Sequence, residues 1–310
     1  MPSLKPLKTE QRNPRSRGLD KKSTLEVLRL LNREDAHVAA SVRRELPKIA
    51  QAVDAIVKAF GKGGRLFYVG AGTSGRLAVL DAAECPPTFG TKPSMVQAII
   101  AGGGKALRRS VEGAEDSATA GARDLSSAGF SKRDVVVGIA ASGTTPYVLG
   151  ALKFAKRHGA ITVGVTSNVD SPLARLSQIA IVPDTGAEIV AGSTRLKAGT
   201  AQKMVLNLLS TAAMVRIGRV YEGWMVHVAL ANSKLRSRGV QILQEAADVT
   251  KRVAERALRE ANYDLAVALV ALKSSTTLRK ARRALASADG NVHKAFESLS
   301  NPHRKPSSHY

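Results

Sequence analysis

Two short turns in the sequence combine glycine with hydroxyl side chains, a combination suited to holding an anion. Gly70–Gly75 reads GAGTSG, and Gly138–Pro146 reads GIAASGTTP. Each turn follows an apolar run and precedes a helical pattern, so backbone N–H groups and the helix dipole would favour negative charge there. Further donors would come from the hydroxyls of Ser74, Ser142, Thr144 and Thr145. Either turn alone is better explained as a tight turn with a helix cap. The pair together predicts a phosphate site.

The first turn also fits the dinucleotide fingerprint G-x-G-x-x-G. A dinucleotide site needs an acidic residue about 20 positions further on, where it binds the ribose. Here the next strand pattern, Met95–Ala101, is followed by GGG and by no Asp or Glu. No G-K-[ST] follows the glycines, so a Walker loop does not fit either. We therefore expect no nicotinamide cofactor.

The elements that must position these turns are strands alternating with helices. Apolar runs predict strands at Arg65–Val69, Met95–Ala101, Asp134–Ala140, Ile161–Thr166 and Ile179–Val182. Helices are predicted at Val38–Phe60, Arg76–Ala83, Lys105–Leu125, Tyr147–His158 and Ala198–Gly218, after a first helix that begins at Ser23 or Thr24. This alternation predicts an α/β fold with a parallel sheet. Beyond about Tyr221 the pattern is helical only, and its end predicts two short helices joined at Asp289–Gly290.

The composition limits the possible classes of function. The formal net charge is +22, yet the basic residues do not alternate with the aromatics that a single-strand binding platform needs. We therefore expect no nucleic-acid partner. No apolar run reaches the roughly 18 residues of a membrane helix, so no membrane partner is expected. The N-terminus has no signal-like apolar region, and the only cysteine is Cys85. A cytoplasmic location is expected.

Several longer stretches resemble a known family. The two turns are similar to the phosphosugar-binding loops of the sugar isomerase (SIS) domain, and more narrowly the chain resembles the N-acetylmuramic acid 6-phosphate etherase family. The stretches that carry the resemblance, spread over residues 9 to about 300, are TEQRNP (9–14), STLEVLRLLNRED (23–35), GAGTSGRLAVLDAAECPPTFG (70–90), VEGAEDS (111–117), DVVVGIAASGTTPYV (134–148), GSTRLKAGTAQK (192–203) and ANSKLRSR (231–238). Two positions depart from the family pattern: Thr144 stands where Arg is frequent, and His227 where Asp is usual.

The resemblance implies an architecture. It implies a SIS-type parallel sheet flanked by helices, with N-terminal helices and a C-terminal all-helical region. We expect a flexible basic tail at 1–22, an N-terminal helical segment at 23–55, a SIS phosphosugar-binding domain at 56–220, a C-terminal helical domain at 221–300 and a tail at 301–310. It also implies a homodimer with sites near the subunit interface.

The resemblance also implies a reaction. The family cleaves the lactyl ether of N-acetylmuramic acid 6-phosphate by elimination and hydration, which yields N-acetylglucosamine 6-phosphate and D-lactate. Such chemistry needs an acid, a base and a phosphate anchor, and no metal or redox cofactor. The family motif makes Glu84 the acid that protonates the leaving lactate, and it selects Glu115 as the second catalytic residue, for which we expect the role of base. The phosphate is expected on Thr73, Ser74, Ser142, Gly143, Thr144 and Thr145.

The residues around these glutamates suggest how each is held. Pro86 and Pro87 follow Glu84, and because proline cannot continue a helix we expect them to hold the carboxylate at a helix break. Glu112 and Glu115 would share one face of the helix predicted at Lys105–Leu125; without the resemblance, a solvated face would explain them better. Burial could raise the pKa of a catalytic carboxylate.

Other residues are weaker candidates. Ser193, Lys197 and Lys234 are possible substrate contacts, although helix capping and surface positions explain them as well. Cys85 is expected to be a small buried residue, and the six histidines lack metal-ligand spacing, so no metal site is expected. Two alternative functions remain open: a non-catalytic phosphosugar sensor, which could dispense with Glu84 and Glu115, and a phosphosugar isomerase, against which the segment ECPPTFG argues.

Overall fold

The computed structural model describes residues 7–300. They form two compact units. The first unit runs to Ala83 and resumes over Pro93–Thr211, and the second contains Glu84–Lys92 and everything from Ala212 onward. The helices expected as a separate segment at 23–55 therefore belong to the same unit as the sheet. The tail expected at 301–310 lies outside the described residues.

A five-stranded parallel sheet forms the centre of the first unit. The strands are β1 (Leu66–Gly70), β2 (Val96–Ile100), β3 (Val135–Ile139), β4 (Ile161–Val165) and β5 (Ile179–Ile181). Their spatial order is β2-β1-β3-β4-β5, and every pairing is parallel. The predicted α/β fold and all five predicted strands are confirmed. From β1 the chain continues to β2 on one side, and it then crosses to β3 on the other side of β1. The direction of strand addition therefore reverses between β1 and β3, which is the switch point of the sheet.

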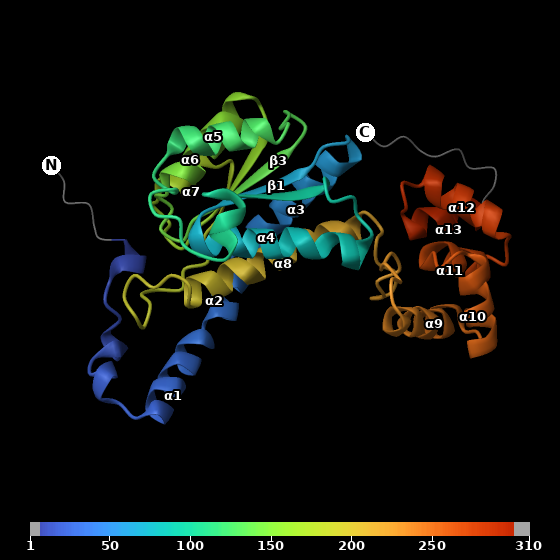
Figure 1. Cartoon of the computed structure of the whole chain (residues 1–310), viewed down its shortest axis with the longest axis horizontal. Coiled ribbons are helices and arrows are strands. Elements are labelled where there is room, and N and C mark those ends of the chain that lie inside the picture. Colours follow the sequence, from blue (N-terminus) through green and yellow to red (C-terminus); the bar gives the residue numbers. More distant parts are fainter. Residues whose placement is uncertain (1–6, 301–310) are drawn as a thin grey trace. The chain divides into compact units, whose positions relative to one another are not determined.

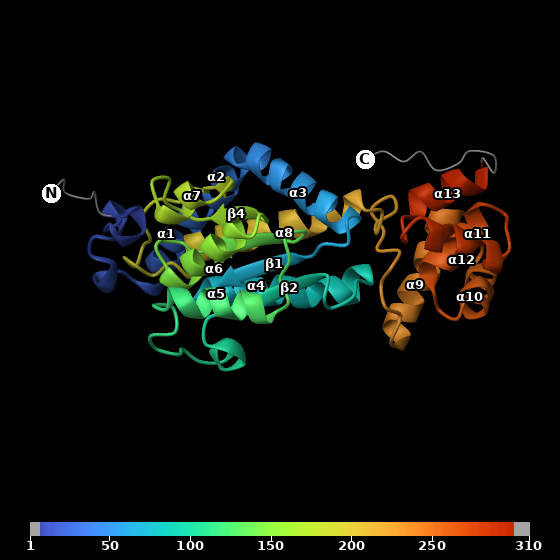
Figure 2. The ribbon, with the colours of Figure 1, turned by 90° about the horizontal axis from the view of Figure 1, so that it is seen from above.

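Helices cover both faces of this sheet (Figures 1 and 2). One face carries α5 (Ala118–Ser127), α6 (Pro146–Arg157) and α7 (Pro172–Leu176). A buried cluster that includes Phe67, Val136 and Leu152 fills the space beneath them. The opposite face carries α3 (Leu46–Gly61), the first part of α4 (Gly72–Phe89) and α8 (Lys197–Arg216). Burial of both faces explains why the strands read as continuous apolar runs.

The N-terminal segment differs from the flexible tail expected at residues 1–22. From Leu7 onward it contains the short 3₁₀ helices η1 (Lys8–Glu10), η2 (Pro14–Ser16) and η3 (Leu19–Lys21). Thr9, Asn13 and Ser16 are buried. The Asn13 amide donates to the Glu34 carboxylate over 2.8 Å and to the Ala187 carbonyl over 3.0 Å. These long-range polar contacts, which basic composition cannot reveal, hold the segment on the first unit.

Two helices follow this segment. α1 (Thr24–Asp35) begins with a capping box between Ser23 and Glu26, as the Ser23 cap predicts. The single helix predicted at Val38–Phe60 is wrong, because α2 (Val38–Arg44) ends before α3 begins at Leu46. Pro47 in the first turn of α3 has no N–H to donate to the preceding turn, so the two helices are separated there.

The helix α4 continues through the proline pair, which corrects the helix break expected after Glu84. Pro86 and Pro87 lie inside the helix, which ends at Phe89. Neither proline can donate a hydrogen bond, so the carbonyls of Ala82 and Ala83 lose their usual intrahelical partners. The helix nevertheless resumes, since the Gly90 N–H donates to the Pro86 carbonyl over 2.9 Å.

The long helix predicted at Lys105–Leu125 is also wrong. A short 3₁₀ helix, η4 (Gly103–Leu107), is followed by a non-helical stretch over 108–117, and α5 begins only at Ala118. Gly113 has a left-handed φ of 68°, and the Ser117 hydroxyl accepts from the Ala120 N–H as the cap of α5. Glu112 and Glu115 therefore do not share a helix face.

The second unit is helical, as predicted. It contains α9 (Ser233–Ala247), α10 (Lys251–Glu260), α11 (Leu265–Lys273), α12 (Leu278–Ser287) and α13 (Val292–Ser300). Residues of α11 from Leu265 to Ala271 are all buried in one cluster. The predicted junction at Asp289–Gly290 is confirmed, and both residues have positive φ. Between residues 7 and 300 we find no helix with the length and apolarity to cross a membrane.

Candidate active site

The two glycine-hydroxyl turns lie at adjacent strand ends. β1 and β3 pair in parallel with Gly70 opposite Ile139, so both turns leave the carboxyl edge of the sheet side by side. This edge at a topological switch point is where open α/β sheets bind ligands. We call residues 71–75 loop 1 and residues 140–146 loop 2. The two turns that the sequence singled out therefore follow neighbouring strands.

Loop 1 packs closely against its surroundings. A Cβ on Gly75 would lie 2.5 Å from the Ile100 side chain and 2.9 Å from the Gly70 carbonyl oxygen, so only glycine fits there. Ser74 is buried, and its hydroxyl lies 2.9 Å from Oε1 of Gln202 on α8. Thr73 is half-buried, and its methyl group faces Gly199 at the start of α8. Loop 1 is thus held between the sheet and α8.

Loop 2 is built around Gly143. Its φ is 72°, and a Cβ there would lie 2.3 Å from the Ser171 hydroxyl oxygen. The Ser142 hydroxyl accepts from the Thr144 N–H over 3.2 Å and from the Thr144 hydroxyl over 3.0 Å. Thr144 is exposed, whereas Ser142 and Thr145 are half-buried. The loop therefore presents three hydroxyl groups on a backbone shape that glycine permits.

Asn168, which follows β4, forms hydrogen bonds with the backbone of loop 2. The Asn168 amide donates to the carbonyls of Ala141 over 3.0 Å and Ser142 over 3.2 Å. Asn168 in turn accepts from the Lys8 N–H over 2.9 Å. Asn168 was not predicted from the sequence, although the polar pair Ser167–Asn168 directly follows a predicted strand. The N-terminal segment and loop 2 are thus joined through one side chain.

Glu115 lies beside the helix that follows loop 2. Its backbone carbonyl accepts from the Tyr147 N–H at the start of α6 over 3.0 Å, and its side chain is exposed. The non-helical stretch 108–117 thus brings Glu115 to the amino end of α6. Exposure differs from the burial expected for a catalytic carboxylate.

Glu84 is also exposed, and it belongs to the second unit. Residues 84–92 pack on the segment around His227. The Ala229 N–H donates to the Pro87 carbonyl over 3.3 Å, and a Cβ on Gly90 would lie 2.7 Å from the His227 carbonyl oxygen. Glu84 is therefore the first residue of α4 that belongs to the second unit.

Comparison with known proteins identifies the family. Residues 48–156 match the glucokinase regulatory protein N-terminal SIS domain model, and residues 115–212 match the SIS domain model. An N-acetylmuramic acid 6-phosphate etherase of Geobacillus thermodenitrificans is 50% identical over 294 residues, which are 95% of this chain and 100% of the relative. The chain belongs to the N-acetylmuramic acid 6-phosphate etherase family.

Further relatives span similar lengths. An etherase of the same name from Aeromonas hydrophila is 52% identical over 284 residues, 92% of this chain and 95% of the relative. Among solved structures, a phosphoheptose isomerase from Neisseria gonorrhoeae aligns with a TM-score of 0.47 and 15% identity, covering 62% of this chain and 98% of its own. The resemblance seen in the motifs is confirmed over most of the chain.

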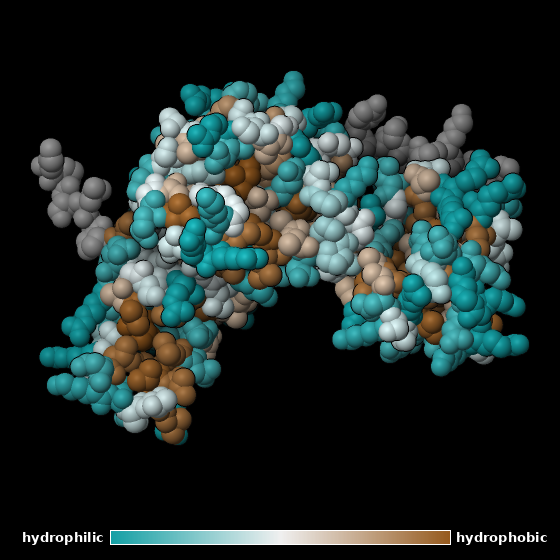
Figure 3. Space-filling view, viewed as in Figure 1, coloured by the Kyte–Doolittle hydropathy of each residue, from teal (hydrophilic) through white to brown (hydrophobic). Residues whose placement is uncertain are grey.

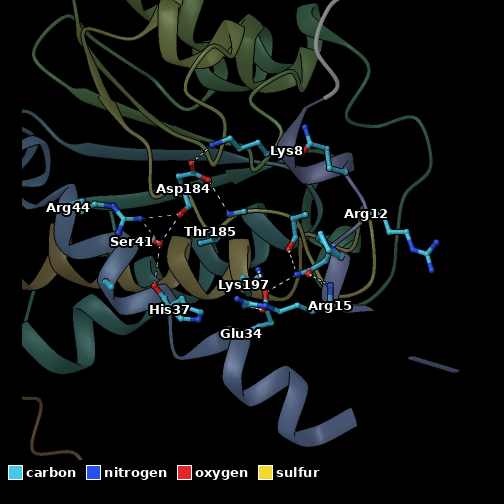
Figure 4. Close-up of a pocket in the computed structure, with 16 residues that line it drawn as sticks. Lys8, Arg12, Arg15, Glu34, His37, Ser41, Arg44, Asp184, Thr185 and Lys197 are labelled. Carbon is cyan, nitrogen blue, oxygen red and sulfur yellow. Dashed lines mark hydrogen bonds and ion pairs between the residues drawn. The ribbon is translucent and has the colours of Figure 1, made fainter. Parts of the chain in front are cut away.

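Lys197, a candidate substrate contact of this etherase family member, takes part in an ion network around the buried Glu34. Its ammonium group lies 2.6 Å from one Glu34 carboxylate oxygen, and Arg15 lies 2.6 Å from the other (Figure 4). Burial acts to raise the pKa of Glu34, but hydrogen bonds from Lys197, Arg15 and Asn13 outweigh it and lower the pKa to about 2. Lys197 is thus paired with a carboxylate that stays ionised.

The backbone N–H groups at the start of α8 already donate to a carboxylate of the same chain. The Glu188 carboxylate accepts from the N–H groups of Lys197 over 3.1 Å and Ala198 over 2.9 Å. A carboxylate at a helix N-terminus satisfies the groups that would otherwise bind an anion. Ser193, half-buried in the turn before α8, lies next to the N-terminal segment, since the Gly192 N–H donates to the Thr9 carbonyl over 3.2 Å.

Two further positions have local structural contacts in the second unit. Lys234 is an exposed residue in the first turn of α9, whose cap is the neighbouring Asn232. His227, which departs from the family pattern, has its Nε2 2.8 Å from the Gly290 carbonyl oxygen. Burial and the nearby Arg219 lower the pKa of His227. His227 therefore packs as a half-buried side chain within this unit.

Asp81 is a buried carboxylate that the motifs did not single out. It lies on α4 and accepts from the Tyr68 hydroxyl over 2.9 Å and the Ser210 hydroxyl over 3.1 Å. Burial raises the pKa of Asp81 to about 6, against the lowering effect of these hydrogen bonds. It joins β1, α4 and α8 beneath loop 1.

Over the described residues no cluster of three or more His, Cys, Asp or Glu side chains could hold a metal ion, and Cys85 is buried as expected.

Proposed function

We propose that this chain cleaves the D-lactyl ether of N-acetylmuramic acid 6-phosphate and releases N-acetylglucosamine 6-phosphate and D-lactate. The observation that supports this most is the pairing of two hydroxyl-bearing loops at the switch point of the sheet in a member of the etherase family. Incubation of the purified protein with this substrate, followed by an assay for D-lactate, tests the proposal.

The proposed reaction takes place on the open-chain sugar. A base removes the proton α to the aldehyde, and an acid protonates the lactate oxygen as the β ether bond breaks. Water then adds across the double bond. In the proposed assignment Glu115 is the base and Glu84 the acid, while loops 1 and 2 anchor the phosphate. Anchoring of the phosphate restricts the motion of the sugar chain, which favours reaction at one fixed carbon.

Ser74 can serve as a phosphate donor only if its hydroxyl hydrogen is available. It currently lies against Oε1 of Gln202, whereas Nε2 of Gln202 is buried with no hydrogen-bond partner in the described part of the chain. A half-turn of the Gln202 amide would make Nε2 the donor to Ser74. The Ser74 hydroxyl hydrogen would then be free to donate to a phosphate oxygen. We propose that Gln202 turns in this way when the substrate binds.

Removal of the loop hydroxyls should weaken substrate binding. We expect Ser74→Ala and Ser142→Ala each to raise the dissociation constant by the equivalent of about 1.5–3 kcal/mol, the usual value of a hydrogen bond to a charged group. Titration calorimetry with N-acetylglucosamine 6-phosphate measures the change, and Ser126→Ala, an exposed serine of α5, is the control. Equal turnover of substrates with and without phosphate would contradict this role of the loops.

We propose that the active form is a homodimer joined through α1. Leu25 and Leu28, one turn apart on α1, are 54% and 56% exposed, and Figure 3 shows hydrophobic side chains gathered over this helix. Exposed apolar patches of this kind mark association sites. A second copy of the chain would cover this apolar face and remove it from water.

Charge on this face should separate the subunits. We expect Leu25→Glu combined with Leu28→Glu to give monomers, because ionised carboxylates cannot be buried without partners. Light scattering during gel filtration measures the mass. Leu46→Glu, at an exposed leucine of α3, should leave it unchanged. If the wild type elutes as a monomer at micromolar concentration, the dimer proposal is wrong.

The cellular setting follows from the proposed substrate. N-acetylmuramic acid occurs in peptidoglycan, so we propose that the reaction belongs to amino-sugar catabolism and peptidoglycan recycling in the cytoplasm. With Cys85 as its only cysteine, the chain can form no internal disulfide, which is consistent with a reducing compartment.

A further inference from the structure

A basic pocket in the first unit is separate from the two loops. It lies between the N-terminal segment, the helices α1 and α2, and the residues after β5 (Figure 4). Its volume is about 780 Å³, within the range of small-molecule sites. The charged groups that line it are Lys8, Arg12, Arg15, Arg44 and Lys197 on the positive side and Glu34 and Asp184 on the negative side. Positive charge is therefore in excess. Within the described part of the chain, its lining includes no residue of loop 1 or loop 2.

Some of these cations already have carboxylate partners. Lys197 and Arg15 are bound to Glu34, and Lys8 forms an ion pair with Asp184. Within the described residues, Glu34 and Asp184 are the only carboxylates in the pocket. Because Glu34 has a pKa of about 2, it is ionised at neutral pH, and its negative charge balances one of the positive charges around it.

Arg12 and Arg44 have no carboxylate partner among residues 7–300. Arg44 donates to the Ser41 hydroxyl over 3.1 Å and to the backbone carbonyl of Asp184 over 3.5 Å, which leaves its charge uncompensated. Arg12 is exposed at the rim, and Figure 4 shows its side chain extended away from the Glu34 network. Arginine presents a planar fork of donors that matches phosphate oxygens. Each of the two guanidinium groups is therefore available to pair with an anion.

The other polar side chains of the lining suit a polar ligand. Asn13, His37, Ser41 and Thr185 place amide, imidazole and hydroxyl groups around the cations. Thr185 is 9% exposed, and its hydroxyl has no hydrogen-bond partner in the described part of the chain. Buried hydroxyl groups normally have a partner. A ligand oxygen in the pocket would supply such a partner.

We propose that this pocket binds a small phosphate-bearing anion, such as a sugar phosphate, at a second site distinct from the phosphate loops. The site connects to loop 2 through short contacts. The Lys8 N–H donates to Asn168, and Asn168 donates to the Ser142 carbonyl. A ligand that holds the N-terminal segment in place would therefore also steady the backbone of loop 2.

Calorimetric titration of the full-length Ser74→Ala/Ser142→Ala variant, in which binding at the loops is weakened, tests the second site. The probes are inorganic phosphate, glucose 6-phosphate and glucose. We expect both phosphate-bearing probes to bind this variant and glucose not to bind. Tighter binding of glucose 6-phosphate would identify a sugar phosphate as the preferred form, and equal binding would show that free phosphate is sufficient; both results support the site. Absence of phosphate binding in this variant would overturn it.

A matched pair of variants separates the pocket from general surface charge. Adding Arg12→Ala and Arg44→Ala should weaken probe binding about a hundredfold, roughly tenfold for each guanidinium lost. Adding Arg17→Ala and Arg43→Ala removes the same charge at neighbouring exposed positions that do not line the pocket, and it should change binding less than twofold. Equal weakening by both pairs would overturn the proposal. Etherase activity is a separate readout, so a failure of the proposed reaction would leave this result interpretable.

Discussion

Replacement of Glu84 by Gln should nearly abolish ether cleavage while proton exchange on the sugar continues. An amide cannot give a proton to the departing lactate oxygen, and general acid–base groups contribute about 10²- to 10⁴-fold. The base would still reach the α proton, so the variant should exchange that hydrogen with heavy water in N-acetylglucosamine 6-phosphate. Glu115→Gln should lose both cleavage and exchange. D-lactate release and proton NMR measure the two steps.

Because both glutamates are exposed, this test separates loss of activity from loss of stability. Neither carboxylate is buried, so the amide variants should keep the melting temperature of the wild type. Glu112→Gln, three residues from Glu115 and equally exposed, is the matched control and should retain both steps. Exchange lost in the Glu84 variant and kept in the Glu115 variant would show that acid and base are reversed. Wild-type cleavage by both variants would exclude these residues as the catalytic pair.

Replacement of Glu34 by Gln should destabilise the first unit by about 3–5 kcal/mol, the usual cost of removing one partner from a buried ion pair. Lys197 would keep its charge with only 4% of its surface exposed, and Arg15 would lose its partner. The pKa of Glu34 falls from 4.5 to about 2 in the folded chain. Its stabilising effect is therefore complete above pH 4.5 and is lost as the pH falls through about 2. Urea unfolding at several pH values measures this.

Two further variants define the origin of the effect. Asp35→Asn removes the next, exposed carboxylate of α1 and should change stability by less than about 0.5 kcal/mol. Glu34→Leu combined with Lys197→Met removes both charges and should recover part of the loss, because no buried charge is left unpaired. If Glu34→Gln unfolds at the same urea concentration as the wild type, the network does not hold the N-terminal segment.

Errors of the sequence-based prediction fall where local patterns compete with contacts. The stretch 105–125 contains good helix formers, yet Gly113 with its left-handed φ and the Ser117 cap divide it. The proline pair after Glu84 predicts a helix end, yet α4 continues to Phe89. Contacts of Pro87 and Gly90 with residues 227–229 hold this last turn. Such contacts join residues about 140 positions apart, so no local pattern contains them.

The sequence by itself determined the strands, the two glycine-hydroxyl turns and the starts of four helices, α1, α2, α6 and α8. Apolar runs, the Ser23 capping box and Gly143 act over a few residues, and their physical effect is local. Only the tertiary structure decided that Glu115 lies at the start of α6 and that Lys197 faces Glu34. It also decided that the basic N-terminal segment forms a pocket wall instead of a free tail. These features depend on strand order and on hydrogen bonds between distant residues, which exist only once the chain has packed.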